Sequence, residues 1–204
     1  TLGFEESGSN TGELTLTTAG ATNFENLIGT AGAETLKGDN NANVLTGYGG
    51  ADTIYGYGGN DTLYAYHDNY LDVDNEADVL YGGAGDDTLV GSTGDNILDG
   101  GTGADTLRGA LGVDTFVIRT GDGSTTLADA NIITDFTNGT DIIAMDSVAY
   151  DDLTIAQGTG AYASHTLVSV TATGEYLLII QNITASNITA ADFSNTSTVP
   201  QTFT

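Results

Sequence analysis

Large apolar residues recur at every ninth position through the first half of the chain. The two series are Leu27, Leu36, Leu45, Ile54 and Leu63, then Leu80, Leu89, Leu98, Leu107 and Phe116. Each of these residues stands between two neighbours that would point the opposite way in a short strand. A short fixed period of this kind predicts stacked repeats with an inner apolar row, rather than an ordinary globular domain.

Polar and glycine positions keep the same period. Glycines open most of the nine-residue blocks, where they allow tight turns and leave carbonyl groups at the bend. The rule is sharpest in Gly82–Arg108, which reads GGAGDDTLV, GSTGDNILD, GGTGADTLR. The sixth positions are Glu25, Glu34, Asn43, Asp52, Asp61, Asp78, Asp87, Asn96, Asp105 and Asp114. We expect two blocks, or eighteen residues, to complete one coil, so that loops two blocks apart stack on the same edge.

These patterns divide the chain into six parts. We expect a cap strand in 1–19, a first roll block in 20–64, an eight-residue insertion at 65–72, and a second roll block in 73–117. A β-rich cap should follow in 118–193, with a hairpin formed by Thr166–Thr171 and Tyr176–Asn182. From Asp114 onwards the residues expected to extend the core are Val117, Ile133, Phe136, Ile142 and Ile143. Residues 194–204 are expected to form a loose tail.

The nonapeptide rule G-G-x-G-x-D-x-U-x resembles that of RTX (hemolysin-type) calcium-binding proteins, over about Gly20–Phe193. The segment DTFVIRTGDGS…ANIITDFTNGTDIIAMDS also resembles the one that follows the repeats in many of them. The resemblance implies an all-β fold, a right-handed parallel β-roll with a C-terminal cap. It also implies a bacterial protein that leaves the cell through the type I secretion machinery and folds outside, where calcium is plentiful.

Calcium needs six to eight oxygen ligands, which loop carbonyls and stacked Asp side chains would supply together. Six pairs of same-edge loops predict about six ions. The candidate ligands are Asn43, Gly47, Gly49, Asp52, Gly56, Gly58, Asp61, Asp78, Gly82, Ala84, Asp87, Asn96, Gly100, Thr102, Asp105, Asp114, Asp135 and Asp141. For Asp122, Asp135 and Asp141, which lie beside glycine turns, the resemblance implies either a further cation or a hydrogen-bonded turn.

Charge limits the partners of this chain. Three Lys and Arg residues stand against 28 Asp and Glu, which gives a net charge of −25. This excludes binding to nucleic acid through phosphate contacts and argues against docking on anionic membrane. Six divalent ions would add twelve positive charges and bring the net charge from −25 to −13. Without cations the repulsion favours disorder, and the absence of cysteine removes disulfides as an alternative support.

No catalytic motif stands out, so we expect a non-enzymatic module of a secreted or surface protein such as an adhesin, cut from a longer chain. An alternative is the RTX tail of an exoenzyme (a protease, lipase or epimerase) with its catalytic domain upstream. Ice binding is a third class, but loop positions three and five carry no regular rank of Thr or Asn. No apolar run is long enough to span a membrane. The sequence leaves open whether copies self-assemble.

Two surface features remain ambiguous. The insertion and the residues after it carry Asp68, Asp72, Asp74, Glu76 and Asp78, which predict either an extra cation site or a solvated acidic loop. Seven tyrosines cluster around the insertion: Tyr48, Tyr55, Tyr57, Tyr64, Tyr66, Tyr70 and Tyr81. They would form an exposed patch for a carbohydrate or cell-surface partner, or simply cover the flank of the roll.

Overall fold

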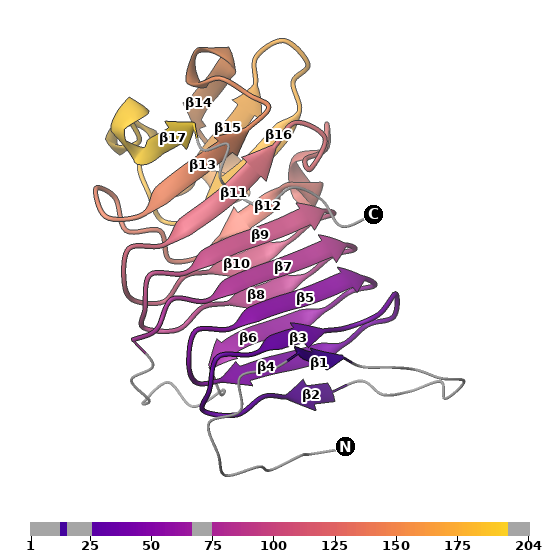
Figure 1. The fold of residues 1–204 in the computed structure, drawn as a ribbon. Coiled ribbons are helices and arrows are strands. Elements are labelled where there is room, and N and C mark those ends of the chain that lie inside the picture. Colours follow the sequence, from indigo (N-terminus) through magenta and orange to yellow (C-terminus); the bar gives the residue numbers. More distant parts are fainter. Residues whose placement is uncertain (1–12, 16–25, 67–74, 196–204) are drawn as a thin grey trace.

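The chain folds as two β-sheets that face each other, and successive strands along the sequence belong alternately to one sheet and to the other. The computed structural model describes residues 13–15, 26–66 and 75–195. Odd-numbered strands up to β13 lie in one sheet and even-numbered strands up to β12 in the other, so that the chain winds from sheet to sheet (Figure 1). Neighbouring strands of each sheet run parallel throughout this part. The prediction of an all-β parallel roll is confirmed.

The eight-stranded sheet has the order β1-β3-β5-β7-β9-β11-β13-β17. Its strands are β1 (Glu13–Thr15), β3 (Thr35–Lys37), β5 (Thr53–Gly58), β7 (Val79–Ala84), β9 (Ile97–Thr102), β11 (Thr115–Arg119), β13 (Ile142–Asp146) and β17 (Phe193–Asn195). The nine-stranded sheet has the order β14-β15-β16-β12-β10-β8-β6-β4-β2. Its strands are β2 (Asn26–Ile28), β4 (Val44–Tyr48), β6 (Thr62–Tyr66), β8 (Thr88–Val90), β10 (Thr106–Arg108), β12 (Asn131–Ile133), β14 (Leu153–Gln157), β15 (Thr166–Val170) and β16 (Tyr176–Ile180).

The strand register reproduces the predicted coil of two blocks. Leu36 pairs with Ile54 and Leu89 pairs with Leu107, each eighteen residues further along the chain. All the apolar residues of the row from Leu36 to Phe116 are fully buried. One inward residue per block therefore forms a continuous core between the sheets, because the strands place alternate side chains on opposite faces.

The insertion changes the register by eight residues without breaking the row. Ile54 pairs with Leu80 and Leu63 pairs with Leu89, at separations of 26 residues instead of eighteen. Ala65 and Tyr66, which the sequence placed in the insertion, belong to β6, where Ala65 is fully buried. The rest of the predicted insertion, 67–72, lies outside the described residues.

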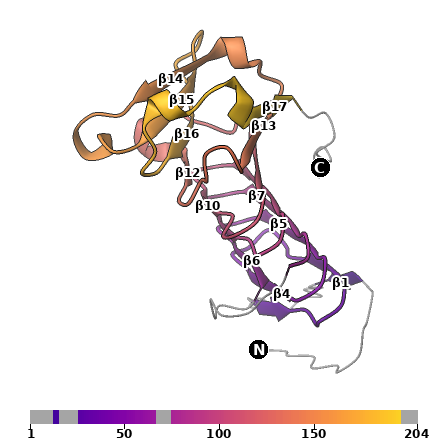
Figure 2. The same cartoon turned by 90° about the vertical axis from the view of Figure 1, so that its left-hand side faces the viewer.

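The C-terminal part first continues the roll and then closes it. Ile133 of β12 pairs with Leu107, and Ile143 of β13 pairs with Phe116, so the stack extends one coil beyond the predicted end at Val117. Strands β14, β15 and β16 are antiparallel, which confirms the predicted hairpin, and β16 joins the stack beside β12 (Figure 2). Five 3-10 turns connect this region: η1 (Leu127–Asp129), η2 (Tyr150–Asp152), η3 (Gly160–Tyr162), η4 (Ala185–Asn187) and η5 (Ala190–Asp192).

Three details of the predicted cap differ from the structure. Val117 is buried on the outer side of the eight-stranded sheet, where it clusters with Tyr81 and Ala144, and Ile142 is half-exposed. Neither belongs to the inner core, because both lie one residue away from an inward position, Phe116 and Ile143 respectively. Ser194 and Asn195, predicted as tail, pair with Ala144 and Met145 in β17.

Glycine at the loop bends is required where one coil lies directly on the next. Gly101 has a φ of 86°, and a Cβ there would collide with the carbonyl oxygen of Gly83 in the preceding coil. Gly139 has a similar φ of 77°, but nothing lies within 4 Å of its Cβ position. A comparison of substitutions at the two glycines therefore distinguishes the loss of stability caused by a positive φ from the loss caused by close stacking of the coils.

We therefore expect Gly101→Ala to cost about 2–5 kcal/mol of stability in saturating calcium, against about 1–2 kcal/mol for Gly139→Ala. Both variants place an alanine at a positive φ, but only the first forces two coils apart. Urea denaturation followed by circular dichroism measures the difference. Equal losses at the two positions would contradict the close stacking of the coils.

Candidate calcium-binding loops

The sixth residues of the blocks form two hydrogen-bonded ladders, one along each edge of the roll. On one edge the backbone N–H groups of Asn43, Asp61 and Asp87 donate to Oδ1 of the residue one coil ahead: Asp61 at 2.7 Å, Asp87 at 2.7 Å and Asp105 at 2.9 Å. On the other edge Glu34, Asp52, Asp78, Asn96 and Asp114 donate in the same way to Asp52, Asp78, Asn96, Asp114 and Asp141, at 2.8 to 3.1 Å. The prediction that loops two blocks apart stack on one edge is confirmed.

These ladders hold the carboxylates inside the loops. Asp61, Asp87, Asp105 and Asp114 are 1–2% exposed. In Asp61, Asp87 and Asp105, Oδ1 accepts the ladder hydrogen bond, while the buried Oδ2 has no hydrogen-bond partner among the described residues. A buried charged oxygen without a donor is costly, so its presence in three successive loops indicates a missing positive charge.

The orphaned oxygens lie beside main-chain carbonyls. A Cβ on Gly82 would touch Asp87 Oδ2 and would lie 2.5 Å from the carbonyl oxygen of Gly100. A Cβ on Gly56 would likewise touch Asp61 Oδ2 and lie 2.5 Å from the carbonyl oxygen of Gly82. The first glycine of each block therefore leaves room for a carboxylate and a carbonyl to converge. A donor set made only of oxygen atoms fits a hard cation such as calcium.

Burial raises the pKa of these carboxyls. The pKa of Asp87 rises to about 8, and those of Asp105 and Asp114 to about 7, with burial as the main cause and neighbouring carboxylates adding to it. The pKa of Asp61 rises to about 6 for the same main reason. The loops therefore favour either protonated carboxyls or a bound cation at neutral pH.

The remaining predicted ligands occupy different places. The third-position residues Gly58, Ala84 and Thr102 lie at the ends of β5, β7 and β9, and the Thr102 carbonyl accepts a hydrogen bond from Gly85 N–H at 2.9 Å. Gly49 N–H donates to the Thr30 carbonyl at 3.1 Å. Gly47 lies in β4, and a Cβ there would lie 2.6 Å from the carbonyl oxygen of Ala65.

Asp135 and Asp141 accept hydrogen bonds from main-chain N–H groups. The two oxygens of Asp135 accept from the N–H groups of Gly109 and Ala110 at 3.0 Å each. Asp141 accepts from Thr137 N–H at 2.7 Å and from Asp114 N–H at 3.1 Å. Asp122 pairs with Arg119 at 3.6 Å. These contacts are compatible with both readings that the sequence left open, and the cation at Asp135 and Asp141 stays a prediction.

One member of the ladders escaped the sequence analysis. Asn131 is 3% exposed, and its Oδ1 accepts from Asp105 N–H at 2.8 Å. It stands two residues before the inward Ile133, as every sixth-position residue stands before its Leu or Ile. This two-residue spacing could have identified Asn131 from the sequence, but no glycine-led block precedes Asn131. Of the acidic cluster near the insertion, Glu76 is exposed and Asp78 is buried in the ladder, while Asp68, Asp72 and Asp74 lie outside the described residues.

Comparison with known proteins agrees with this geometry. A family model for the RTX calcium-binding nonapeptide repeat matches residues 28–63, 66–96, 81–116 and 90–127. These segments of the chain therefore consist of RTX calcium-binding repeats. The matched RTX segments contain both ladders from Glu34 to Asp114 and end before the closing strands.

Solved structures with a similar fold include two subunits of the mannuronan C5-epimerase of Azotobacter vinelandii. The AlgE6R2 subunit is 21% identical, with 87% of this chain and 96% of that chain covered and a TM-score of 0.38. The AlgE6R3 subunit is 22% identical, with 96% and 84% covered and a TM-score of 0.31. No curated protein matches the chain. Within the described residues, no helix has the length and apolar character needed to cross a membrane.

Removing the charge of two ladder carboxyls tests the candidate ligands. We expect Asp87→Asn with Asp105→Asn to raise the calcium midpoint of folding at least about tenfold, because each loop keeps its ladder acceptor but loses a carboxylate ligand. Asn already occupies this position at Asn96. The matched control is Asp151→Asn in the exposed turn η2. A calcium titration followed by circular dichroism measures both, and an unchanged midpoint in the double variant would contradict the assignment.

The raised pKa values predict a pH dependence in the absence of calcium. The pKa of Asp87 is about 8 in the folded chain and near 3.8 when unfolded, so its burial lowers the stability of the calcium-free fold as the pH rises from about 4 to about 8. In EGTA we therefore expect β-structure to increase on acidification from pH 8. In excess calcium the β-structure should instead decrease on acidification, because protons compete with calcium for the loop carboxylates. If the calcium-free chain became more stable as the pH rose, this predicted pH dependence would be wrong.

Proposed function

We propose that this chain is a non-enzymatic structural module of a secreted bacterial protein, which folds when its loops bind calcium outside the cell. The observation that carries the proposal is the set of buried Oδ2 atoms of Asp61, Asp87 and Asp105, which have no hydrogen-bond partner among the described residues and lie beside main-chain carbonyls. Bound calcium would neutralise these oxygens and lower the net charge from −25.

The ligands in this proposal come from two successive coils. The ladder residues from Asn43 to Asp114 would supply side-chain oxygens, and the bends of the neighbouring blocks would supply carbonyls. Among the residues that the structure describes, no three acidic or histidine side chains gather as a cluster of their own. Main-chain oxygens therefore have to complete each site, which explains why the loop glycines matter as much as the aspartates.

Two pairs of adjacent carboxyls, Asp86 with Asp87 and Asp151 with Asp152, are candidates for the paired carboxylates that glycosidases use. Asp87 belongs to the ladder, and Asp86 Oδ1 accepts from Ala104 N–H at 2.9 Å in the next coil. Asp151 and Asp152 lie in the exposed turn η2. These contacts support a module that provides structure, to which secretion through the type I machinery and attachment to a larger surface protein or adhesin are added as parts of the proposal.

Counting bound ions tests the proposed function. Equilibrium dialysis of the full chain against calcium should give about six ions per chain, with dissociation constants in the range of about 10⁻⁴–10⁻³ M that extracellular sites show. Magnesium at the same concentration should not replace calcium, since it requires a smaller octahedral shell and keeps its waters. A chain that bound fewer than two calcium ions would refute the proposal.

A further inference from the structure

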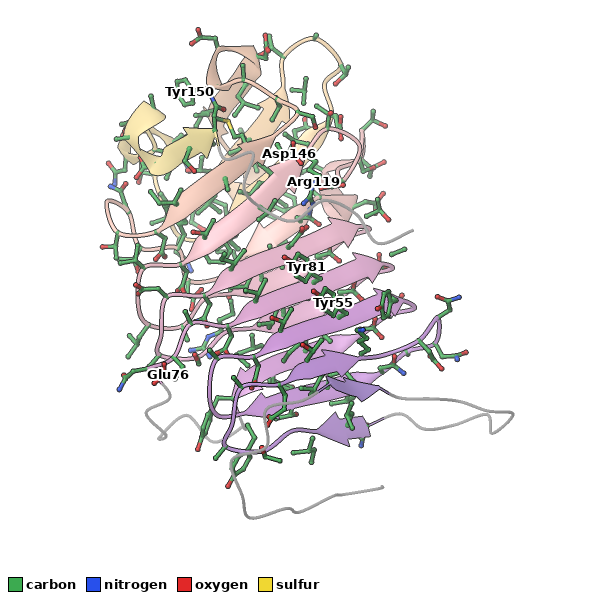
Figure 3. The ribbon with its side chains drawn as sticks, viewed as in Figure 1. Tyr55, Glu76, Tyr81, Arg119, Asp146 and Tyr150 are labelled. Carbon is green, nitrogen blue, oxygen red and sulfur yellow. The ribbon has the colours of Figure 1, made fainter. Side chains whose placement is uncertain are left out.

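A cleft opens on the outer face of the eight-stranded sheet, across four neighbouring strands. In the first row of outward residues, Tyr55 of β5, Tyr81 of β7 and Asp99 of β9 stand at matching register positions. In the second row Tyr57 pairs with Gly83, and Gly83 pairs with Gly101. Arg119 lies on the same face of β11, two residues after Val117 (Figure 3).

Main chain at Gly83 and Gly101 lines the second row. A cavity of about 290 Å³ lies over these glycines, between Tyr57 at one end and Arg119 at the other. The three strand spacings from β5 to β11 make it about 14 Å long. This volume lies near the lower end of small-molecule sites, which suits a ligand of one or two rings.

One end of the cleft is a rigid aromatic wall. The rings of Tyr55 and Tyr81 are stacked with centroids 5.0 Å apart and planes 6° apart, and Tyr57 stacks on Tyr55 at 6.0 Å. Tyr81 is only 6% exposed, whereas Tyr55 and Tyr57 are half-exposed. The wall therefore presents apolar ring surface and phenolic groups without losing side-chain freedom on binding.

The other end is a charged cluster built around Arg119. Its two terminal nitrogens each donate to an oxygen of Asp99 at 2.6 Å, and its Nε donates to Asp146 at 3.1 Å. Asp122 lies 3.6 Å from the guanidinium. These contacts use three or four of the five guanidinium N–H groups, and the carboxylates keep lone pairs that accept further hydrogen bonds.

The charges select the ligand. Three carboxylates surround one guanidinium, and the whole chain carries −25, so an anion is repelled. The Arg119 guanidinium occupies the position among these carboxylates that a metal ion would need. What remains complementary is a neutral ring with hydroxyl groups: its hydroxyls donate to carboxylates and accept from Arg119, while its C–H faces pack on tyrosine.

We propose that this cleft binds a neutral saccharide of one or two rings. The cleft lies on the sheet face, and its lining includes Ala84 and Thr102 at the ends of β7 and β9, which are also candidate calcium ligands, so this site adjoins the calcium loops. Calcium supports the site by holding β5, β7, β9 and β11 in place. The module would then carry its own contact to glycans in addition to its structural role.

The test uses the full chain in saturating calcium. Glucose, galactose, mannose, maltose and cellobiose are screened by saturation-transfer NMR, with glucuronate as the anionic and choline as the cationic comparison, and calorimetry measures the affinity of each binder. We expect at least one neutral sugar to bind, with an affinity at least tenfold weaker in Tyr57→Ala. The matched control is Tyr48→Ala, which also removes a stacked tyrosine at a positive φ, but from β4 in the other sheet. It should bind as the original chain does.

Tyr57→Phe keeps the ring if the alanine variant fails to fold, and should weaken binding about threefold through loss of the hydroxyl. Calcium-induced circular dichroism of each variant separates loss of the fold from loss of the cleft. Binding of choline or glucuronate instead of neutral sugars would overturn the proposal. It would equally be overturned by no sugar binding, or by sugar binding that ignores Tyr57 or that depends equally on Tyr48.

Discussion

In EGTA the chain should be unfolded, and millimolar calcium should convert it to a β-structured roll. The inner row supplies one large apolar residue per nine, which is a thin core for the backbone that it must order. The loops also bury Asp61, Asp87, Asp105 and Asp114 along the same edges where they repel each other. Above the raised pKa values of these carboxyls, bound cations remove that repulsion, so calcium and folding should be coupled in one cooperative step.

Far-ultraviolet circular dichroism and size-exclusion chromatography follow this transition. We expect the calcium-free chain to give a random-coil spectrum and a large hydrodynamic radius, and both should change together near millimolar calcium. Magnesium at equal ionic strength is the control for general screening. A chain that is already β-structured in EGTA, or that folds equally in magnesium, would contradict the mechanism.

A chain that ends at Val117 should stay disordered even in calcium. In the full chain Leu107 and Phe116 are fully buried, and the residues paired with them in the next coil are Ile133 of β12 and Ile143 of β13. The ladders lose their final acceptors as well, since Asp105 donates to Asn131 and Asp114 donates to Asp141. Truncation would expose the last coil and leave both ladders open, and terminal repeats need a cover.

The matched control is a chain that ends at Asn195, which keeps β17 and removes only residues outside the described part. It should fold in calcium at the same midpoint as the full chain. Circular dichroism and calcium titration of both truncated chains decide the matter. If the chain ending at Val117 folded as cooperatively as the full chain, the closing role of β12 to β17 would be refuted.

The nine-residue period was sufficient to predict stacked coils with an inner apolar row, and the resemblance of the nonapeptide rule to RTX repeats implied the parallel β-roll. The inward row from Leu36 to Phe116 and the stacking of the sixth positions follow from spacing alone, because a strand of three residues has one inward side chain. The hydrogen bonds that join the sixth positions into ladders appear only in the structure. The same period also predicted the eight-residue change of register between the two roll blocks. It placed the start of the insertion at Ala65, although Ala65 continues β6, because alanine hides the first-position role that glycine marks elsewhere.

Other features were set by contacts between distant coils. The sequence suggested a single group of tyrosines, but the alternation of blocks between two sheets separates Tyr55, Tyr57 and Tyr81 from Tyr48 and Tyr66, and Tyr70 lies outside the described residues. The pairing of Arg119 with Asp99 and Asp146 depends on strands that are neighbours only through the coil.

The sequence by itself therefore determined the period, the inner row, the stacking of the sixth-position carboxylates and their preference for an oxygen-binding cation. Only the tertiary structure decided where the roll ends, which carboxylate oxygens have no donor among the described residues, and that a cleft lies between tyrosines and Arg119. The physical reason is that the repeat specifies interactions within a coil and with the next one. Outward side chains carry no such constraint, so their neighbours follow from the register across several strands.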